Sequence, residues 1–306
     1  METNKSYVWS HGILIAAVCF CASLSVGLVM PVNPNTSEAQ TKQATNVKET
    51  GAKVGTQQRM ETFKAAMLTS WQEEAKTKGF SYDVPSRFHG AVVESAKLTK
   101  GEKVIALTFD DGPWAESTAE VLDILKKNNI KATFFVVGQM LKTYPELGKR
   151  IVAEGHVIGN HTWHHWYHYF NPQAAAYEID STTDLIYQIT GARTTLFRPP
   201  GGIMHNGVAA YAKNRNYTLV MWSADSIDYS RPAVPKLIKN VMRDSKPGGI
   251  VLMHDGGGNR SRTVQALPEI ISNFRKQGYR FVTVPELLEM ENRELQLAAG
   301  QKSNTK

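Results

Sequence analysis

Two adjacent aspartates are the first residues of this sequence whose types and spacing point to chemistry. Asp110 and Asp111 follow the apolar run 104–109 and precede Gly112 and Pro113, a pair that suits a tight turn. Two neighbouring carboxylates repel each other, so such a pair usually needs a cation or a shared proton. An ordinary surface turn accounts for the same residues, and the pair alone does not decide between these interpretations.

A group of histidines could supply the rest of a metal site. His161 and His165 stand four positions apart, so on a helical turn both imidazoles would face one side and His164 would point elsewhere. A histidine pair at this spacing is a common way to hold zinc. Four of the nine histidines of the chain lie within 161–168, which weakens the alternative of an aromatic-rich loop with incidental histidines.

One carboxylate and two imidazoles would leave coordination positions of a metal open. Zinc with open positions lowers the pKa of bound water to about 7, which gives a nucleophile at neutral pH. The same ligands resemble the two-histidine, one-carboxylate site of iron oxygenases. We favour hydrolysis because Asp110, beside the candidate ligand Asp111, is a ready base for water.

Further polar groups follow apolar runs later in the chain. His254 could protonate a leaving group, and Asp228 or Asp225 could orient it and raise its pKa. Arg198 could hold a carboxylate in place. A buried, hydrogen-bonded histidine and a structural salt bridge are the alternative explanations for His254 and Arg198.

Alternating strand-like and helix-like runs must position these groups. The strand-like runs are 104–109, 133–137, 156–159, 195–197, 218–222, 250–253 and 280–284. The helix-like runs are 117–127, 144–154, 174–189, 206–213, 234–243, 264–276 and 285–290. This alternation predicts an α/β fold with parallel strands, and seven units favour a barrel-like closure. The candidate residues follow the carboxyl ends of strands, so we expect them to meet at one mouth.

An apolar segment near the N-terminus predicts export. Residues 12–30 approach the length that a helix needs to cross a bilayer. Lys5 precedes them and no lysine or arginine follows until Lys42, which predicts that the N-terminus stays inside. A signal peptide has nearly the same pattern. We therefore expect residues 1–30 to be a signal peptide or membrane anchor, and the body of the protein to be extracytoplasmic, either anchored at the cell surface or secreted.

Composition divides the rest of the chain. The expected parts are a polar linker at 31–60, a helical lead-in at 61–94, a catalytic domain at 95–290 and a polar, disordered tail at 291–306. Cys19 and Cys21 are the only cysteines, and both lie in the apolar segment. No disulfide can therefore cross-link the body of the chain, and no thiolate can bind a metal there.

The charge of the chain suggests affinity for polyanions. The formal net charge is +7 and the pI is about 9.2. The basic residues are scattered without a Lys/Arg-rich block, so we expect no nucleic-acid partner. An anionic cell wall or membrane face fits the charge equally well.

Five ordered motifs give the sequence its resemblance to a known family. They are Thr108–Gly112, His161–His165, Arg198–Gly202, Asp225–Tyr229 and Leu252–His254. Over about 95–289 the chain resembles the polysaccharide deacetylase family with the NodB homology domain, carbohydrate esterase family 4. The resemblance implies a distorted (β/α) barrel of about seven parallel strands. It also implies a divalent metal, with Zn²⁺ expected first and Co²⁺, Mn²⁺ or Ni²⁺ as alternatives.

The resemblance also implies a role for each motif residue. Asp111, His161 and His165 would be the metal ligands, and Asp110 the base that accepts a proton from water. His254 would protonate the departing amine, with Asp228 as its partner and Arg198 orienting Asp110. The remaining implied roles are the oxyanion N–H at Gly201, the acetyl-methyl pocket at Leu252 and sugar stacking at Tyr229.

Two positions depart from the commonest family pattern. Gly201 stands where an aromatic residue is frequent, and Tyr229 stands where tryptophan is usual. Glycine keeps the backbone N–H that helps hold the oxyanion, but a wall of the groove is lost. Nearby aromatic residues could stack on sugar or pack in the core; they are Trp114, Trp163, Trp166 and Tyr167. We expect these differences to affect substrate preference more than activity.

The sequence thus predicts an enzyme that removes N-acetyl groups from N-acetylglucosamine units of a cell-wall polysaccharide, with peptidoglycan as the first expectation. Chitooligosaccharide or another glycan, including O-acetyl xylan, is the alternative substrate. A catalytically inactive wall-binding module is the alternative of another class. That alternative predicts a missing ligand or base, and none is missing here.

Overall fold

The computed structural model describes residues 80–99 and 101–303. The expected signal or anchor segment, the polar linker and most of the helical lead-in lie outside these residues. In the part that is described, none of the helices combines the length and apolarity needed to cross a bilayer.

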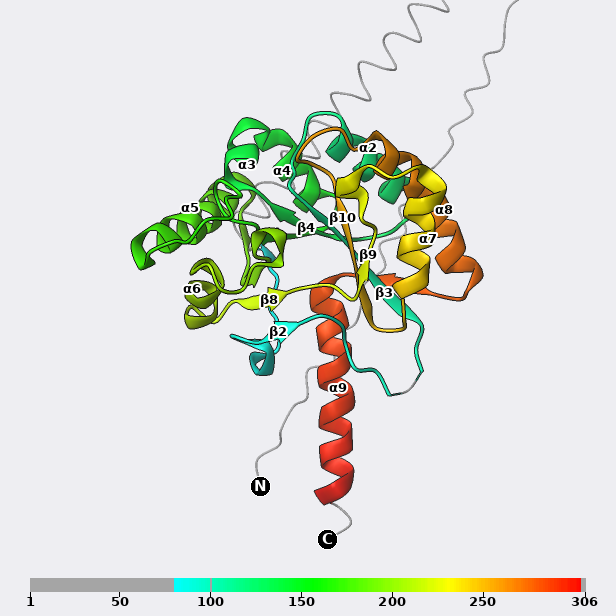
Figure 1. Cartoon of the computed structure of the whole chain (residues 1–306). Coiled ribbons are helices and arrows are strands. Elements are labelled where there is room, and N and C mark those ends of the chain that lie inside the picture. The colour runs from blue at the N-terminus through cyan, green and yellow to red at the C-terminus, as the bar shows by residue number, and fades with distance from the viewer. Residues whose placement is uncertain (1–79, 100, 304–306) are drawn as a thin grey trace, which may run out of the picture. The chain divides into compact units, whose positions relative to one another are not determined.

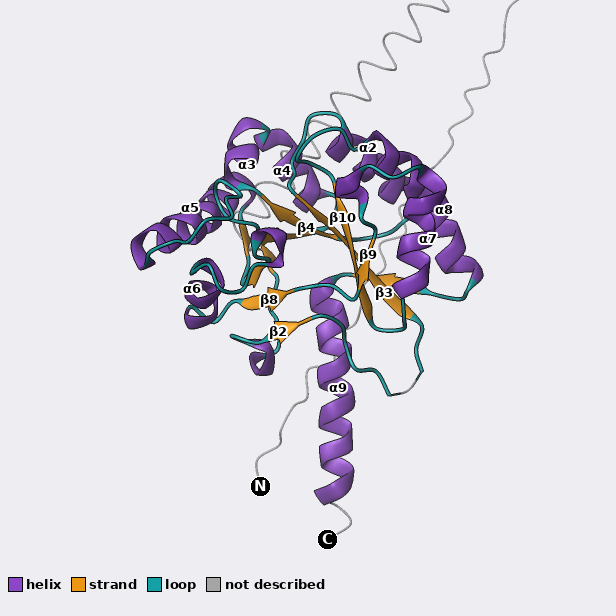
Figure 2. Ribbon diagram, in the orientation of Figure 1, coloured by secondary structure: helices purple, strands orange, loops and turns teal. Residues whose placement is uncertain are grey.

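Parallel strands form a curled sheet at the centre of the domain (Figure 2). Along the sheet the order is β2 (Val92–Val93), β8 (Thr218–Val220), β7 (Leu196–Phe197), β5 (Val157–Asn160), β4 (Thr133–Val136), β3 (Val104–Asp110), β10 (Gly249–His254) and β9 (Ala224–Asp225). β11 (Arg280–Val282) also pairs with β3, and β1 (Phe80–Ser81) pairs separately with β6 (Ala192–Arg193). Within the described residues β2 and β9 do not pair with each other, so the barrel is open.

Most helices lie around the outside of this sheet, whereas the last helix extends away from its lower end in Figure 1 and packs its first turn with the interior side chains. The helices are α2 (Ser117–Lys127), α3 (Gly138–Thr143), α4 (Pro145–Ala153), α5 (Pro172–Thr190), α6 (Val208–Asn214), α7 (Val234–Asp244), α8 (Ser261–Lys276) and α9 (Val284–Ser303). The 3₁₀ turns are η1 (Ser86–Phe88), η2 (Pro200–Gly202) and η3 (Asp228–Ser230). The predicted distorted (β/α) barrel is confirmed, with eight strands along the curled path instead of about seven.

Side chains along β3 alternate between the two faces of the sheet, and this alternation places Asp110 on the interior face. Ile105, Leu107 and Phe109 pack in a core cluster with residues of the surrounding helices. Val104 and Ala106 pack in a second cluster with interior residues of the neighbouring strands. Because successive side chains of a strand face opposite sides, Asp110 continues the interior-facing set at the carboxyl end of β3.

The C-terminal tail corrects one expectation. We expected disorder after Met290, but α9 continues to Ser303. Glu291 accepts a hydrogen bond from the backbone N–H of Lys97 at 3.0 Å, and Glu294 accepts one from that of Thr99 at 2.6 Å. A polar composition therefore did not mean disorder here, because the acidic side chains bind the segment that leads into β3.

Candidate active site

The carboxyl ends of the strands surround a pocket of about 590 Å³. The predicted site residues that line it are Asp110, Asp111, His161, His165, Gly201, Tyr229, Leu252 and His254. Arg198 and Asp228 lie behind this surface as buried residues. The structure therefore brings together, at one mouth, groups that are more than 140 positions apart in the sequence.

Asp111 and two histidines form a cluster suited to a metal ion. Nε2 of His165 lies 3.0 Å and Nε2 of His161 lies 3.5 Å from Oδ1 of Asp111. The three ligand atoms all lie within 4.8 Å of one another. Oδ1 of Asp111 is buried and has no hydrogen-bond partner among the described residues. A buried carboxylate oxygen facing two imidazole nitrogens fits a divalent cation that accepts N and O ligands.

The other ring nitrogen of His161 determines how the imidazole can bind. Nδ1 of His161 lies 2.7 Å from the backbone carbonyl oxygen of Arg198. A carbonyl oxygen only accepts hydrogen bonds, so Nδ1 carries the proton and Nε2 presents its lone pair to the cluster. This is the arrangement that fixes the orientation of a metal-binding histidine.

Burial and the histidines act in opposite directions on Asp111. Burial alone raises the pKa of this carboxyl, but the neighbouring His161 and His165 outweigh burial and hold the pKa well below its usual range. Asp111 therefore stays ionised, as a metal ligand must be.

A loop, and not the predicted helical turn, brings the two histidines together. Thr162 and His165 have positive φ values of 67° and 62°. The side-chain oxygen of Asn160 accepts a hydrogen bond from the N–H of Thr162 at 2.8 Å, and the Thr162 hydroxyl accepts one from the N–H of His165 at 3.1 Å. Left-handed backbone at non-glycine residues is costly and concentrates at functional sites. The prediction that the two imidazoles lie together is confirmed, but the helical turn that we expected to bring them together is not present.

Asp110 lies beside this cluster and is held by Arg198. Nη1 of Arg198 donates to Oδ1 of Asp110 and to the Thr108 hydroxyl, each at 2.8 Å. The guanidinium also donates to the backbone carbonyl oxygens of Val220 and Met221 and lies over the Phe135 ring. Oδ2 of Asp110 instead faces the cluster, 3.7 Å from Nε2 of His161. One carboxylate oxygen is thus anchored, and the other is directed at the ligand cluster.

A glycine loop after β10 closes over Asp111. A Cβ atom on Gly256 would lie 2.2 Å from the backbone carbonyl oxygen of Asp111, and one on Gly257 would lie 2.5 Å from its Oδ2. Asp111 itself has a φ of 74°, which aspartate tolerates better than most residues. These contacts leave room for nothing larger than glycine and fix the carboxylate in its unusual backbone conformation.

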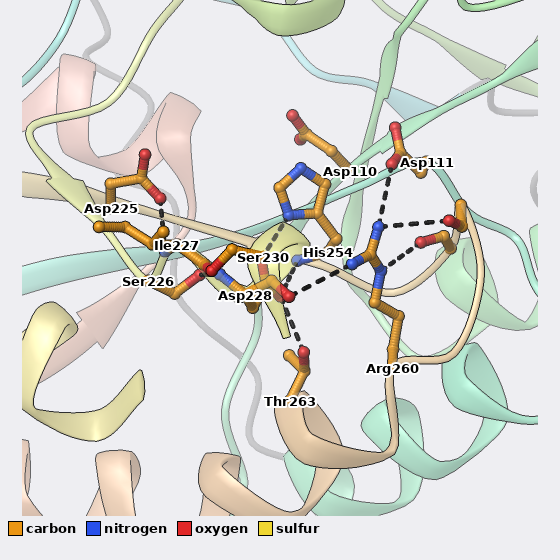
Figure 3. Close-up of polar contacts among 12 residues, drawn as sticks. Asp110, Asp111, Asp225, Ser226, Ile227, Asp228, Ser230, His254, Arg260 and Thr263 are labelled. Atoms are coloured by element: carbon orange, nitrogen blue, oxygen red, sulfur yellow. Dashed lines mark hydrogen bonds and ion pairs between the residues drawn. The ribbon is translucent and has the colours of Figure 1, made fainter. Parts of the chain in front are cut away.

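His254 pairs with Asp228 on the other side of the pocket (Figure 3). Nδ1 of His254 lies 2.6 Å from Oδ1 of Asp228, and Oδ2 of Asp228 accepts from the His254 backbone N–H and the Thr263 hydroxyl. Burial alone lowers the pKa of His254. The hydrogen bond and charge of Asp228, with the charges of Asp111 and Asp110, outweigh burial and raise the pKa to about 9. The imidazole is therefore protonated at neutral pH.

The structure distinguishes the two aspartates that could have oriented His254. Asp225 accepts a hydrogen bond from the backbone N–H of Ile227 at 2.7 Å and lines the pocket. Asp228 is 3% exposed and makes the direct contacts with the imidazole. Asp225 therefore supports the turn that carries Asp228, and Asp228 is the partner of His254.

Two charged residues that the sequence reasoning did not single out support the site. Arg260 is buried, lies 3.6 Å from Oδ2 of Asp111, and donates to the carbonyl oxygens of Gly256 and Asp228 (Figure 3). Glu178 on α5 is buried and accepts hydrogen bonds from the backbone N–H groups of Trp163 and His164. Three consecutive glycines, 256–258, precede Arg260 and could have marked this segment as part of the site. Nothing in the sequence marked Glu178.

Comparison with known proteins agrees with the motifs. A sequence model described as polysaccharide deacetylase matches residues 97–220. A peptidoglycan-N-acetylglucosamine deacetylase of Bacillus cereus is 43% identical over 195 residues, which are 63% of this chain and 91% of that protein. A peptidoglycan-N-acetylmuramic acid deacetylase of Bacillus subtilis is 35% identical over 198 residues, 61% of this chain and 72% of that protein.

Solved structures show the same fold. A peptidoglycan N-acetylglucosamine deacetylase bound to a naphthyl-substituted N-hydroxybenzamide matches with a TM-score of 0.61 and 36% identity, covering 66% of this chain and 94% of that one. A carbohydrate esterase family 4 pseudoenzyme from Bacillus anthracis matches with a TM-score of 0.59 and 30% identity, covering 65% and 69%. The motifs, the fold and these relatives together show that the chain belongs to the polysaccharide deacetylase family.

Proposed function

We propose that this protein hydrolyses the acetamide of N-acetylglucosamine units in peptidoglycan and releases acetate and a free amino sugar. One observation carries the proposal: a carboxylate oxygen of Asp110, fixed by Arg198, faces the Asp111–His161–His165 cluster from outside the ligand set. A base held beside a metal cluster is the arrangement that hydrolysis by an activated water requires.

Asp111, His161 and His165 would hold a divalent metal, for which we propose Zn²⁺. When bound, such an ion polarises a carbonyl group and lowers the pKa of water. Oδ2 of Asp110 accepts a proton as the water oxygen forms its bond to the carbonyl carbon. Arg198 keeps the Asp110 carboxylate oriented through the 2.8 Å contact with Oδ1.

His254 completes the reaction at the leaving nitrogen. Its Nδ1–H is bound to Asp228, so its other ring nitrogen is the one that can donate to the substrate. Breaking the C–N bond leaves an electron pair on nitrogen, which takes this proton and departs as a neutral amine. Gly201 lines the pocket, and its backbone N–H is the proposed oxyanion donor. Leu252 lines the floor on which the acetyl methyl group would rest.

The substrate and location follow from the relatives and from the N-terminal sequence. The curated relatives described above act on peptidoglycan, as their names state. The apolar segment 12–30 would export the domain to the compartment where that polymer lies. We propose an extracytoplasmic enzyme, membrane-anchored or secreted.

A panel of acetylated polymers tests the proposal. Purified protein is incubated with peptidoglycan, chitooligosaccharide and O-acetyl xylan, and acetate is measured. We expect release from peptidoglycan to exceed release from the other two. A chelator should abolish the activity, and added Zn²⁺ should restore it, because three side chains alone cannot polarise the carbonyl.

Each result of this panel has a distinct meaning. Preferential release from chitooligosaccharide or xylan would contradict the proposed substrate but not the reaction. No release from any polymer, by protein shown to bind metal, would contradict the enzymatic proposal. It would favour an inactive wall-binding module of the kind represented by the family's pseudoenzyme.

The His254–Asp228 pair predicts the alkaline limb of the pH profile. A general acid must be protonated, so kcat/KM should fall as pH rises through the raised pKa of about 9. In Asp228→Asn the hydrogen bond and charge that raise this pKa most are gone, while burial, which lowers the pKa, and the smaller contributions of Asp111 and Asp110 remain. The alkaline limb should therefore move to lower pH, toward the ordinary histidine value of about 6.5. Acetate release between pH 5.5 and 10 measures the shift.

Asp225→Asn is the matched control for this prediction. Asp225 also lines the pocket, but it accepts a hydrogen bond from the Ile227 backbone and does not contact the His254 ring as Asp228 does. Its replacement should move the alkaline limb much less. An unchanged limb in Asp228→Asn would show that His254 does not supply the proton.

A further inference from the structure

The loop after the metal-ligand histidines has two sets of alternating side chains. The rings of one set contact one another in succession, and we call them the ring stack. His164 stacks on Trp166 with centroids 4.0 Å apart, Trp166 packs tilted by 39° against His168 at 5.3 Å, and His168 stacks on Phe170 at 4.4 Å. The intervening residues His165 and Tyr167 instead line the pocket.

Both ends of this ring stack are anchored in the domain. Nδ1 of His164 lies 2.5 Å from the buried carboxylate of Glu178. Phe170 is 2% exposed, and its backbone N–H donates to the carbonyl oxygen of Asn206 at 2.8 Å. The stack therefore holds the loop in place and presents the pocket-facing residues in a fixed position.

Tyr167 occupies the space that a side chain at position 201 would need. A Cβ atom on Gly201 would lie 2.9 Å from Cε1 of Tyr167. Gly201 also has a φ of 59°, which L-residues rarely adopt. The tyrosine ring thus covers the glycine and supplies aromatic surface where the third motif has none.

The position of Tyr167 resembles that of Tyr229 at the other end of the pocket. Tyr167 packs edge-on against His165, with centroids 5.2 Å apart and an interplanar angle of 79°. Tyr229 packs edge-on against His254, at 5.9 Å and 82°. The two tyrosines are 57% and 54% exposed, so about half of each side chain is open to contact from the pocket side. Each one flanks an imidazole of the candidate catalytic centre.

We propose that Tyr167 is a substrate-positioning residue whose ring forms an aromatic wall of the pocket and binds the apolar face of the acetylated sugar. This inference rests on the proposed function. In this proposal Tyr167, which follows the candidate ligand His165 on the same loop, supplies the aromatic wall that Gly201 lacks. A flat aromatic face offers apolar contact to the C–H groups of a pyranose ring, and its loss should weaken binding more than the chemical step.

Steady-state kinetics with an N-acetylglucosamine pentamer tests the role of Tyr167. Tyr167→Ala should raise KM about tenfold and leave kcat within about twofold, because the ring contacts the sugar in ground state and transition state alike. Tyr167→Phe keeps the ring and should recover the wild-type KM. Tyr169→Ala is the matched control, since Tyr169 lies on the same loop, is 75% exposed and is outside the pocket lining. It should leave KM unchanged.

A binding measurement separates this inference from the proposed function. Calorimetric titration measures the affinity for the pentamer in Asp110→Asn protein and in the same variant that also carries Tyr167→Ala. This measurement requires no turnover. A weaker pentamer affinity with Tyr167→Ala, at unchanged metal content, would support the wall even if wild-type protein released no acetate. Equal affinities, or an equal loss of affinity in Tyr169→Ala, would overturn it. Wild-type protein that binds the pentamer but releases acetate from neither the pentamer nor peptidoglycan would contradict only the proposed function.

Discussion

Asp110→Asn should reduce kcat by about 10²- to 10⁴-fold, the usual contribution of a positioned general base. Asparagine keeps the size of the side chain and an oxygen that can accept from Arg198, so the geometry around Oδ1 is preserved. The lost function is proton acceptance at Oδ2, the oxygen that faces the cluster. Acetate release under saturating substrate measures the effect.

Metal binding should survive the Asp110→Asn substitution, because Asp110 is outside the proposed ligand set. Retained metal with lost activity is therefore the expected combination. Activity within about tenfold of wild type would assign the base to another residue.

Arg198→Met should lower the free energy of unfolding by about 3–5 kcal/mol, because it leaves the Asp110 carboxylate buried without its partner. Arg198 is 0% exposed and bonds to groups on two strands, β3 and β8, and to Met221, the residue that follows β8. Methionine fills a similar volume with no charge. For a domain of this size the loss corresponds to a decrease in Tm of roughly 10 °C.

Thermal unfolding monitored by circular dichroism measures the effect of Arg198→Met. Arg293→Met is the control: Arg293 is paired with Glu289 on the exposed part of α9, and its loss should change the Tm by less than about 2 °C. Equal Tm values for Arg198→Met and wild type would show that the buried pair does not stabilise the fold.

Much of the fold was predictable because strand and helix periods differ. All seven strand-like runs contain a strand, and each helix-like run contains a helix. β2 and β9 were missed because two residues are too few for an alternating pattern. α3 was missed because six residues are too few for a helical period to show; it ends before Tyr144, since Pro145 at the start of α4 disfavours helical backbone at the residue before it.

The site was predictable as a set of residues but not as a geometry. The types and strand-end positions of Asp111, His161 and His165 indicated a metal cluster, and the structure places them together. The left-handed conformations of Thr162 and His165 had no signal, because neither residue is glycine. Glu178 on α5 accepts hydrogen bonds from backbone groups 14 and 15 residues earlier in the chain, and only the tertiary structure shows these contacts.

The fold alone does not decide activity in this family. The solved structures similar to this chain include a deacetylase and a pseudoenzyme with nearly equal TM-scores, 0.61 and 0.59. The decision lies in individual side chains at the mouth of the barrel, since function belongs to sites and not to folds. In this chain Asp110, the candidate ligands and the His254–Asp228 pair all lie in position to act.

Zinc titration of Asp110→Asn and Asp111→Asn, the same substitution at neighbouring aspartates, tests the central assignment most directly. Asparagine tolerates the φ of 74° at position 111, so both variants should fold. We expect Asp110→Asn to bind one equivalent of Zn²⁺ with wild-type affinity and to lose kcat by about 10²- to 10⁴-fold. We expect Asp111→Asn to lose zinc affinity by at least about tenfold. Zinc affinity equal in Asp111→Asn and wild type, or lost in Asp110→Asn, would contradict the division of the two carboxylates into ligand and base.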